Sequence, residues 1–113
     1  MNRLKLIVNN TLINKEKFFI KKELKTILNL YAKKVSCGDW KDYSLSINKK
    51  EISFDVYQGA SKTPVFRISK NLNPKNKSEK FYVLDGSGKK IKSSENIDKL
   101  ISRTRWEKLR LVK

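Results

Sequence analysis

Gly59, Lys62 and Thr63 are residue types that a phosphate-binding loop uses, in the segment Gly-Ala-Ser-Lys-Thr-Pro. In such a loop four residues and a second glycine separate the first glycine from the lysine, and the lysine opens a helix whose amides hold the phosphate. Here two residues separate Gly59 from Lys62, and the second glycine is missing. Pro64 lacks an amide hydrogen, biases Thr63 toward extended geometry and precedes a strand-like pattern. We therefore predict a turn between two strands, not a nucleotide site.

The sequence lacks the side chains of the common catalytic and metal-binding sites. It contains no histidine, and Cys37 is its one cysteine. Ser-His-Asp and Cys-His pairs, imidazole ligands, thiolate zinc sites and an intramolecular disulfide are therefore excluded. Cys37 precedes Gly38 at a predicted helix end, which is the wrong pole for an activated thiolate, so we interpret it as a small filler residue.

Isolated carboxylates are the remaining candidates for catalytic chemistry. Asp39, Asp42, Asp55 and Asp85 lie near predicted strand or loop boundaries. A carboxylate-based hydrolase or a magnesium site stays open for them, although such residues mostly cap turns or face solvent. We expect a protein that is not an enzyme and that uses no metal and no cofactor.

The chain is strongly basic, which indicates a polyanionic partner. Its 113 residues include 27 Lys and Arg against 11 Asp and Glu, for a net charge of +16. Such a charge favours RNA, DNA or an acidic membrane surface. However, 22 of the basic residues are lysine, whereas bidentate contacts to bases favour arginine. Lys, Asn and Ile, which share A/T-rich codons, total 42 residues, so a low-GC genome would also account for the charge.

Our first hypothesis is a non-catalytic module that binds RNA through lysine–phosphate contacts. Residues 62–80 contain six basic and one acidic side chain, and residues 89–113 contain nine and three. If the outer face of the predicted sheet is open, Tyr57, Arg67 and Tyr82 would present aromatic and cationic groups together, as RRM-like sheets do. The RNP1 pattern is absent, so this comparison is an analogy of fold. The candidate nucleic-acid-binding residues are Lys62, Arg67, Lys70, Lys75, Lys77, Lys80, Lys89, Lys90, Arg103 and Arg105.

The alternative hypothesis is a protein-interaction or assembly factor whose charge is compositional background. Residues 35–61 contain three lysines and four acids and are the one segment without net positive charge. Within it, Trp40, Asp42 and Tyr43 place two aromatic rings beside acidic groups. An exposed tryptophan can serve as a binding platform. The simpler interpretation is that Trp40 covers the end of the core.

Residues 21–36 show the clearest helical periodicity. An apolar stripe with spacings of three and four residues is formed by Leu24, Ile27, Leu28, Tyr31 and Val35. Gly38 follows where a left-handed C-cap belongs. Packing of this stripe on a sheet is favoured over a helix lying on a membrane.

From Asp42 onward the apolar period is two, which predicts about five antiparallel strands. They are expected at 43–47, 52–57, 65–70, 81–85 and 89–93, with a polar loop at 71–80. A final helix contains Ile97, Leu100 and Ile101, with Ser93 or Ser94 as its cap and Glu95 in its first turn. Residues 4–8 and 18–20 are further short strand candidates, and residues 105–112 fit helix or strand.

The order of these elements predicts an α+β fold and one compact domain over residues 1–113. We expect an antiparallel meander sheet of about five strands, packed against an N-terminal and a C-terminal helix. The apolar run near the N-terminus is too short for a signal peptide, and no segment approaches the roughly 20 apolar residues of a membrane span. We expect a soluble, cytoplasmic protein, and its oligomeric state stays open.

A set of spaced residues also matches a known pattern, Trp-x-Asp-Tyr, a strand, then Ala-Ser-x-x-Pro and Tyr/Phe-Arg-Ile-x-Lys. The matching residues are Trp40, Asp42, Tyr43, Ala60, Ser61, Pro64, Phe66, Arg67, Ile68 and Lys70. On these residues, and on the helix at 23–35, the chain resembles a family of small bacterial proteins known only as a domain of unknown function, typical of alphaproteobacteria. The resemblance covers half to two-thirds of the chain. It implies a compact domain and no particular activity.

Overall fold

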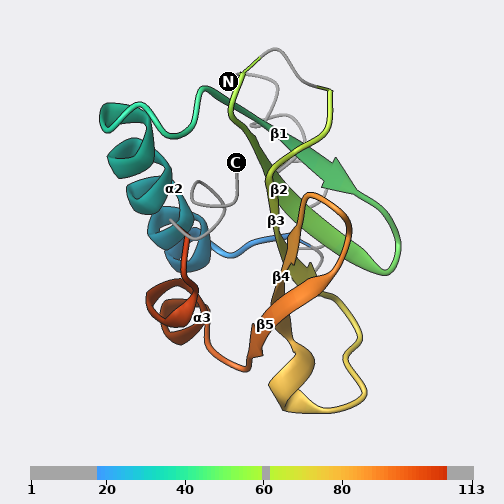
Figure 1. Ribbon diagram of the computed structural model, residues 1–113. Coiled ribbons are helices and arrows are strands. Elements are labelled where there is room, and N and C mark those ends of the chain that lie inside the picture. The colour runs from blue at the N-terminus through green and yellow to red at the C-terminus, as the bar shows by residue number, and fades with distance from the viewer. Residues whose placement is uncertain (1–17, 60–61, 107–113) are drawn as a thin grey trace.

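One helix, five strands and a second helix follow one another along the chain (Figure 1). The computed structural model describes residues 18–59 and 62–106. The elements are α2 (Lys21–Ser36), β1 (Asp42–Ile47), β2 (Glu51–Tyr57), β3 (Phe66–Asn71), the 3₁₀ turn η2 (Lys77–Glu79), β4 (Phe81–Asp85), β5 (Lys90–Ser94) and α3 (Ile97–Arg103). The strands form one antiparallel sheet in the order β1-β2-β3-β4-β5, so the predicted α+β meander is confirmed.

The alternation of each strand divides the sheet into two unlike faces. The inner face carries Ile52, Phe54 and Val56 of β2, which lie across from Lys70, Ile68 and Phe66 of β3. Both helices lie on this side of the sheet (Figure 1). Apart from Lys70, these inner residues belong to one hydrophobic core, which also takes in Ile27, Leu30, Trp40, Phe81, Val83, Leu100 and Trp106.

The helix α2 has the predicted bounds, but its buried face differs from the predicted stripe. Glu23, Ile27, Leu30 and Lys34 are its buried residues, whereas Leu28 and Val35 are exposed. The helix is therefore turned so that its apolar stripe lies at the edge of the core. Two charged side chains occupy buried positions instead, and both have partners there.

A buried ion pair joins the start of α2 to the middle of the sheet. Lys70 Nζ lies 2.8 Å from Glu23 Oε1 and donates a second hydrogen bond to the Phe18 carbonyl at 2.9 Å. The same Glu23 oxygen accepts the Ile20 amide at 2.9 Å, which satisfies a free N–H at the helix start. One ion pair thus fixes both the entry of the chain into α2 and the position of α2 on β3.

The loops and caps agree with the sequence in part. The described parts of the connection between β2 and β3, residues 58–59 and 62–65, contain no helix. Val65 N–H bonds to Val56 O at 2.8 Å, and β3 begins at Phe66. Gly38 has φ +82°, as the predicted C-cap requires. The predicted cap of α3 was wrong: Asn96 Oδ1 accepts the Lys99 amide at 3.0 Å, and Glu95 precedes the helix.

Three smaller predictions have other outcomes. Residues 18–20 are not a strand, since Phe19 is in the core and Ile20 caps α2. Cys37 is exposed and does not fill the core. Helix α3 ends at Arg103, whereas the predicted strand at 4–8 and most of the 105–112 tail lie outside the described residues. Neither described helix is long and apolar enough to span a membrane.

Candidate functional site

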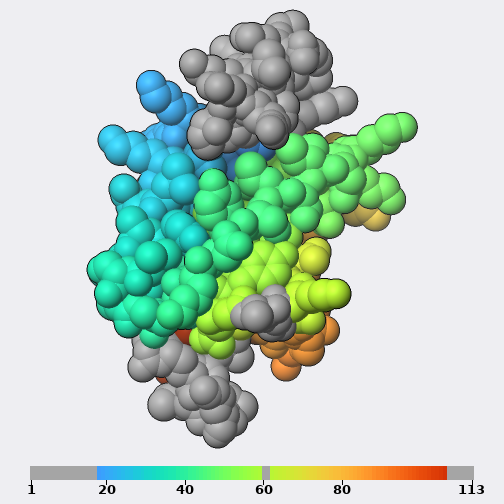
Figure 2. Space-filling view, turned by 90° about the horizontal axis from the view of Figure 1, so that it is seen from above, coloured from blue at the N-terminus to red at the C-terminus, as the bar shows by residue number. Residues whose placement is uncertain are grey.

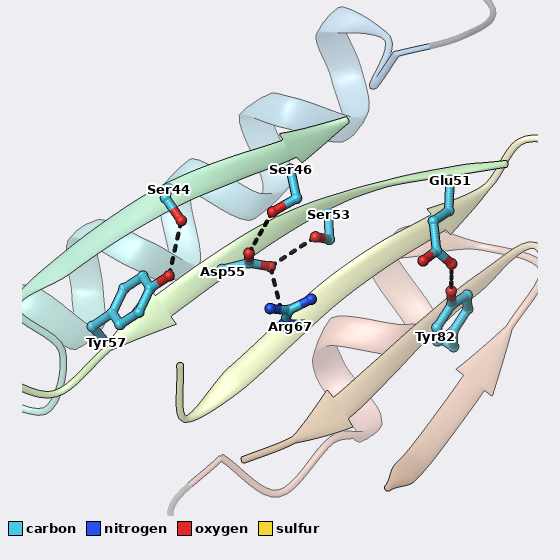
Figure 3. Close-up of polar contacts among 8 residues, drawn as sticks. All are labelled: Ser44, Ser46, Glu51, Ser53, Asp55, Tyr57, Arg67 and Tyr82. Carbon is cyan, nitrogen blue, oxygen red and sulfur yellow. Dashed lines mark hydrogen bonds and ion pairs between the residues drawn. The ribbon is translucent and has the colours of Figure 1, made fainter. Parts of the chain in front are cut away.

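Polar side chains gather on the outer face of the sheet, opposite the helices (Figure 3). The register aligns Ser46, Ser53, Ser69, Tyr82 and Ser93 in one row across all five strands. The neighbouring row contains Ser44, Asp55, Arg67, Leu84 and Lys90. The strand alternation that builds the core thus also brings hydroxyl, carboxylate and cationic groups together on one face.

Asp55 is the centre of this outer face, and its side chain is only 2% exposed. Its Oδ2 accepts the Ser46 hydroxyl at 2.8 Å, and its Oδ1 accepts the Ser53 hydroxyl at 2.7 Å. Arg67 Nε lies 3.8 Å from the same Oδ1 (Figure 3). Both oxygens of the buried carboxylate therefore have a partner on the outer face of the sheet.

Tyr82 lies on the same face, but its ring is not open for stacking. Its hydroxyl donates to the Glu51 carboxylate, and Lys90 Nζ lies 4.8 Å from the ring centroid. The residue is 9% exposed, whereas the Arg67 side chain is 44% exposed. Tyr57, Arg67 and Tyr82 thus share a face as expected, but only Arg67 is well exposed, so they do not form an aromatic platform of the RRM kind.

The Tyr82 hydroxyl should ionise at a higher pH than the hydroxyl of an ordinary tyrosine. Burial, and next the hydrogen bond to Glu51, raise the pKa of Tyr82 to about 12. Because the unfolded chain loses this proton near pH 10, the stabilisation is complete below pH 10 and is lost as the pH rises toward 12. We expect the difference in phenolate absorbance between the wild type and Tyr82→Phe to appear near pH 12 and to be flat between pH 9 and 11. A difference that titrates near pH 10, while the tryptophan fluorescence still reports a folded protein, would contradict this assignment.

Lysines from two separate segments lie along the β5 edge of the sheet, toward its two ends: Lys89 and Lys90 at the β4–β5 hairpin, and Lys77 beside the Ser94 end. Lys90 and Lys92 belong to β5, which is an edge strand, and Lys89 precedes it. Lys77 belongs to η2, which contacts β5 (Figure 1). We call the resulting surface the basic edge, and it comprises Lys75, Lys77, Lys80, Lys89, Lys90 and Lys92.

Two acidic residues accompany the basic edge, and one of them holds a turn. Asp85 Oδ1 accepts the Ser87 hydroxyl at 2.7 Å, the Ser87 amide at 2.9 Å and the Lys89 amide at 3.0 Å. The Ser87 hydroxyl and then the Lys89 amide keep the pKa of Asp85 below its usual value. Asp85 thus closes the β4–β5 hairpin that positions Lys89. With Glu79 as the second acid, six lysines face two carboxylates.

The other residues predicted to bind nucleic acid differ in their exposure and in their position. Lys62 is exposed in the β2–β3 connection, which borders the β4–β5 hairpin because Gly86 lies against Pro64. Arg103 is exposed as the last residue of α3, and Arg105 is exposed just after the helix. Lys70 is the clear correction, since it is buried against Glu23 on the inner face and presents no charge to a ligand.

Sequence reasoning also missed one member of the basic edge. Lys92 is not among the predicted contacts. It is exposed on the edge strand across from Val83 of the inner face, whereas Lys90 lies across from Leu84 of the outer face, because the register shifts between Val83 and Leu84. The strand alternation itself places Lys70 on the side of Phe66 and Ile68, and so could have excluded it from the outer surface.

The residues predicted for protein interaction are divided between the core and the surface. Trp40 is 2% exposed and contacts the rings of Phe66 and Trp106, with centroid distances of 6.1 and 5.6 Å. It is therefore a core residue and not a platform. Asp42 and Tyr43 are exposed on β1. Within residues 18–59 and 62–106, no group of three or more His, Cys, Asp or Glu side chains is placed to hold a metal ion.

The comparisons with known proteins assign the chain to a family. No curated protein and no solved structure is similar enough to the chain to be matched. A family model described as "Protein of unknown function (DUF2794)" matches residues 17–101, which include α2, the whole sheet and most of α3. Since this match covers well over half of the sequence, the chain belongs to the DUF2794 family.

Proposed function

We propose that the protein is a non-catalytic nucleic-acid-binding module that holds RNA through phosphate contacts from the basic edge. The observation that carries the proposal is the contact of η2 with β5, which places the lysine segments 75–80 and 89–92 along one edge of the sheet. Point charges on flexible side chains suit the repeated phosphates of a nucleic-acid backbone, with no requirement for a particular base. Binding of this kind depends on charge and little on sequence.

The arrangement of the lysines also has a simpler explanation. Lysine on an edge strand prevents the strand from pairing with another sheet, and this needs no ligand. That explanation applies to Lys90 and Lys92 of β5. It does not apply to Lys75, which precedes η2, or to Lys77, which is the first residue of η2. The surface therefore carries more positive charge than protection of the strand edge requires.

Matched charge variants test the proposal. We expect Lys77→Gln/Lys90→Gln/Lys92→Gln to weaken binding of a fluorescently labelled single-stranded RNA at least roughly tenfold at about 50 mM salt, because three phosphate contacts are lost. The control variant Lys21→Gln/Lys22→Gln/Lys25→Gln removes the same charge from exposed positions of α2. Equal weakening by both variants would show that net charge alone matters, and it would contradict a defined interface.

The second candidate is a protein-interaction or assembly role, and an exposed apolar strip favours it. Leu28 and Val35 of α2 are 39% and 40% exposed. Tyr31 of α2 contacts Tyr43 of β1 with a ring centroid distance of 5.1 Å, so the strip continues from the helix onto the edge strand. In Figure 2 the surfaces of α2 and β1 adjoin without a break.

A native pull-down with and without nuclease separates the two roles. Nucleic-acid binding predicts that partners are lost on nuclease treatment and in moderate salt. A protein interaction predicts a discrete partner that survives both treatments and is lost in Leu28→Gln/Tyr43→Ser but retained in the variant of Lys77, Lys90 and Lys92. Retention of that partner by Leu28→Gln/Tyr43→Ser would contradict the role of the apolar strip.

A further inference from the structure

Arg67 is held on one side of its guanidinium group and open on the other. Its Nε lies 3.8 Å from Asp55 Oδ1, and its side chain is 44% exposed. In the part of the chain that the structure describes, its two terminal amino groups have no partner. The two terminal nitrogens of a guanidinium group form a planar fork whose geometry matches two oxygens of a phosphate.

Asp55 is built to keep this fork in place. It lies directly across from Arg67 in the register of β2 and β3. Its two oxygens are bound to Ser46 and Ser53, so the carboxylate cannot turn away from the arginine (Figure 3). An arginine fixed before a ligand arrives loses less conformational entropy on binding than a free lysine does. The network of Ser46, Ser53 and Asp55 therefore has an effect beyond the stability of the sheet.

A second cation lies in the same row of the sheet. Leu84 pairs with Arg67 on one side and with Lys90 on the other. Arg67 and Lys90 are thus two strand spacings apart, about 10 Å between their backbones. Both side chains are long enough to reach a group above Leu84. The Tyr82 ring, 4.8 Å from Lys90 Nζ, helps to hold the lysine over the sheet.

We propose that Arg67 and Lys90 form an anion site on the outer face that takes one phosphate group, with Asp55 as the residue that positions Arg67. This inference rests on the proposed function. Lys90 belongs to the basic edge and Arg67 to the outer face, so an RNA bound at the basic edge would extend onto the outer face of the sheet at this site. The ligand is a phosphate mono- or diester bound through two of its oxygens. The site recognises the backbone and not a base.

Asp55→Asn distinguishes a positioned arginine from a simple effect of net charge. The variant removes a negative charge, and simple electrostatics predicts tighter RNA binding for it. If Asp55 positions the arginine, Asp55→Asn weakens binding several-fold instead. Arg67→Lys keeps the charge and loses the fork, and we expect it to weaken binding by a similar factor. Asp42→Asn is the matched control, because it removes an exposed carboxylate of β1 and leaves Arg67 untouched.

The experiment combines RNA affinity with a direct readout of Arg67. Labelled single-stranded RNA is titrated into the wild type, Arg67→Lys, Asp55→Asn and Asp42→Asn, each checked for folding by its thermal transition. In parallel, inorganic phosphate is titrated into the ¹⁵N-labelled wild type and Asp55→Asn. The Nε–H signal of Arg67, identified by its loss in Arg67→Lys, should shift with phosphate in the wild type and shift less in Asp55→Asn.

The outcomes separate the anion site from the proposed function. The anion site is overturned if Arg67→Lys binds RNA with unchanged affinity, or if the Arg67 signal does not shift with phosphate. This holds even if Lys77→Gln/Lys90→Gln/Lys92→Gln still loses binding. Tighter binding in Asp55→Asn overturns the positioning role. Wild type that fails to bind RNA but whose Arg67 signal responds to phosphate overturns the proposed function and supports the anion site. Since Arg67 is exposed and Arg67→Lys keeps the charge beside Asp55, this variant tests the anion site even if Asp55→Asn does not fold.

Discussion

Lys70→Met is expected to lower the free energy of unfolding by about 3–5 kcal/mol, which is a large part of the stability of a small domain. The change leaves Glu23 buried, at 8% exposure of its side chain, without the cation that compensates it. It also removes the hydrogen bond from Lys70 to the Phe18 carbonyl at the entry to α2. Urea denaturation followed by far-UV circular dichroism measures the loss as a lower midpoint with little change in slope.

A double-mutant cycle shows whether the loss comes from the ion pair. Glu23→Gln alone should also destabilise strongly, since it leaves the Lys70 ammonium buried. The double variant Glu23→Gln/Lys70→Met removes both charges, and we expect it to be more stable than Lys70→Met alone. The ion pair would not be what holds α2 on the sheet if Lys70→Met cost less than about 1 kcal/mol of stability. The same would follow if the stability losses of the two single variants simply added up in the double variant.

Trp40→Ala is expected to cost about 3–5 kcal/mol of folding stability, because it leaves a large cavity in the core. The indole is 2% exposed and contacts three other aromatic rings, those of Tyr31, Phe66 and Trp106. It lies in the segment between α2 and β1, so its loss would separate the end of the helix from the sheet. Thermal unfolding at fixed pH and salt measures the effect.

Tyr43→Ala is the matched control for this prediction. Tyr43 is three residues from Trp40 and is also aromatic, but it is 37% exposed and stacks on Phe54 at the edge of the sheet. We expect a cost of roughly 1–2 kcal/mol, because Tyr43 has two ring contacts, with Phe54 and Tyr31, while its own side chain is partly exposed. If Trp40→Ala cost no more than Tyr43→Ala, Trp40 would be a surface residue, and its interpretation as a binding platform would return.

The fold was largely predictable because its strongest signals are local. Alternation at 43–47 and 52–57 gives strands whatever lies around them, and short connections make neighbouring strands pair. The shared outer face of Tyr57 and Arg67 follows from the same alternation. The prediction of α2 succeeded in its bounds, because a helix of sixteen residues has a clear period.

The failures all involve partners that are distant in the sequence or choices among similar residues. The apolar residues alone predict the wrong buried face for α2, because Glu23 and Lys34 are buried where each has a polar partner. The partner of Glu23 lies 47 residues away, and no local pattern connects the two. The same distance explains why the sequence alone predicts Lys70 at the surface. A single sequence does not reveal which of several serines and asparagines caps α3.

The candidate site was less predictable than the fold. The strand pattern assigns Arg67 to the outer face but says nothing of how exposed it is or what holds it. The bonds from Ser46 and Ser53 to Asp55 depend on the register of β1 and β2, which only the folded sheet provides. The basic edge required the contact between η2 and β5, which brings together two segments separated by β4.

The salt dependence of RNA binding tests the central claim most directly. The affinity of the wild-type protein for a labelled single-stranded RNA is measured between about 50 and 300 mM potassium chloride. If four to six lysines of the basic edge each neutralise a phosphate, the plot of log affinity against log salt should have a slope of roughly −3 to −4. Absence of binding at about 50 mM salt, or a slope shallower than about −1, would contradict a nucleic-acid-binding function.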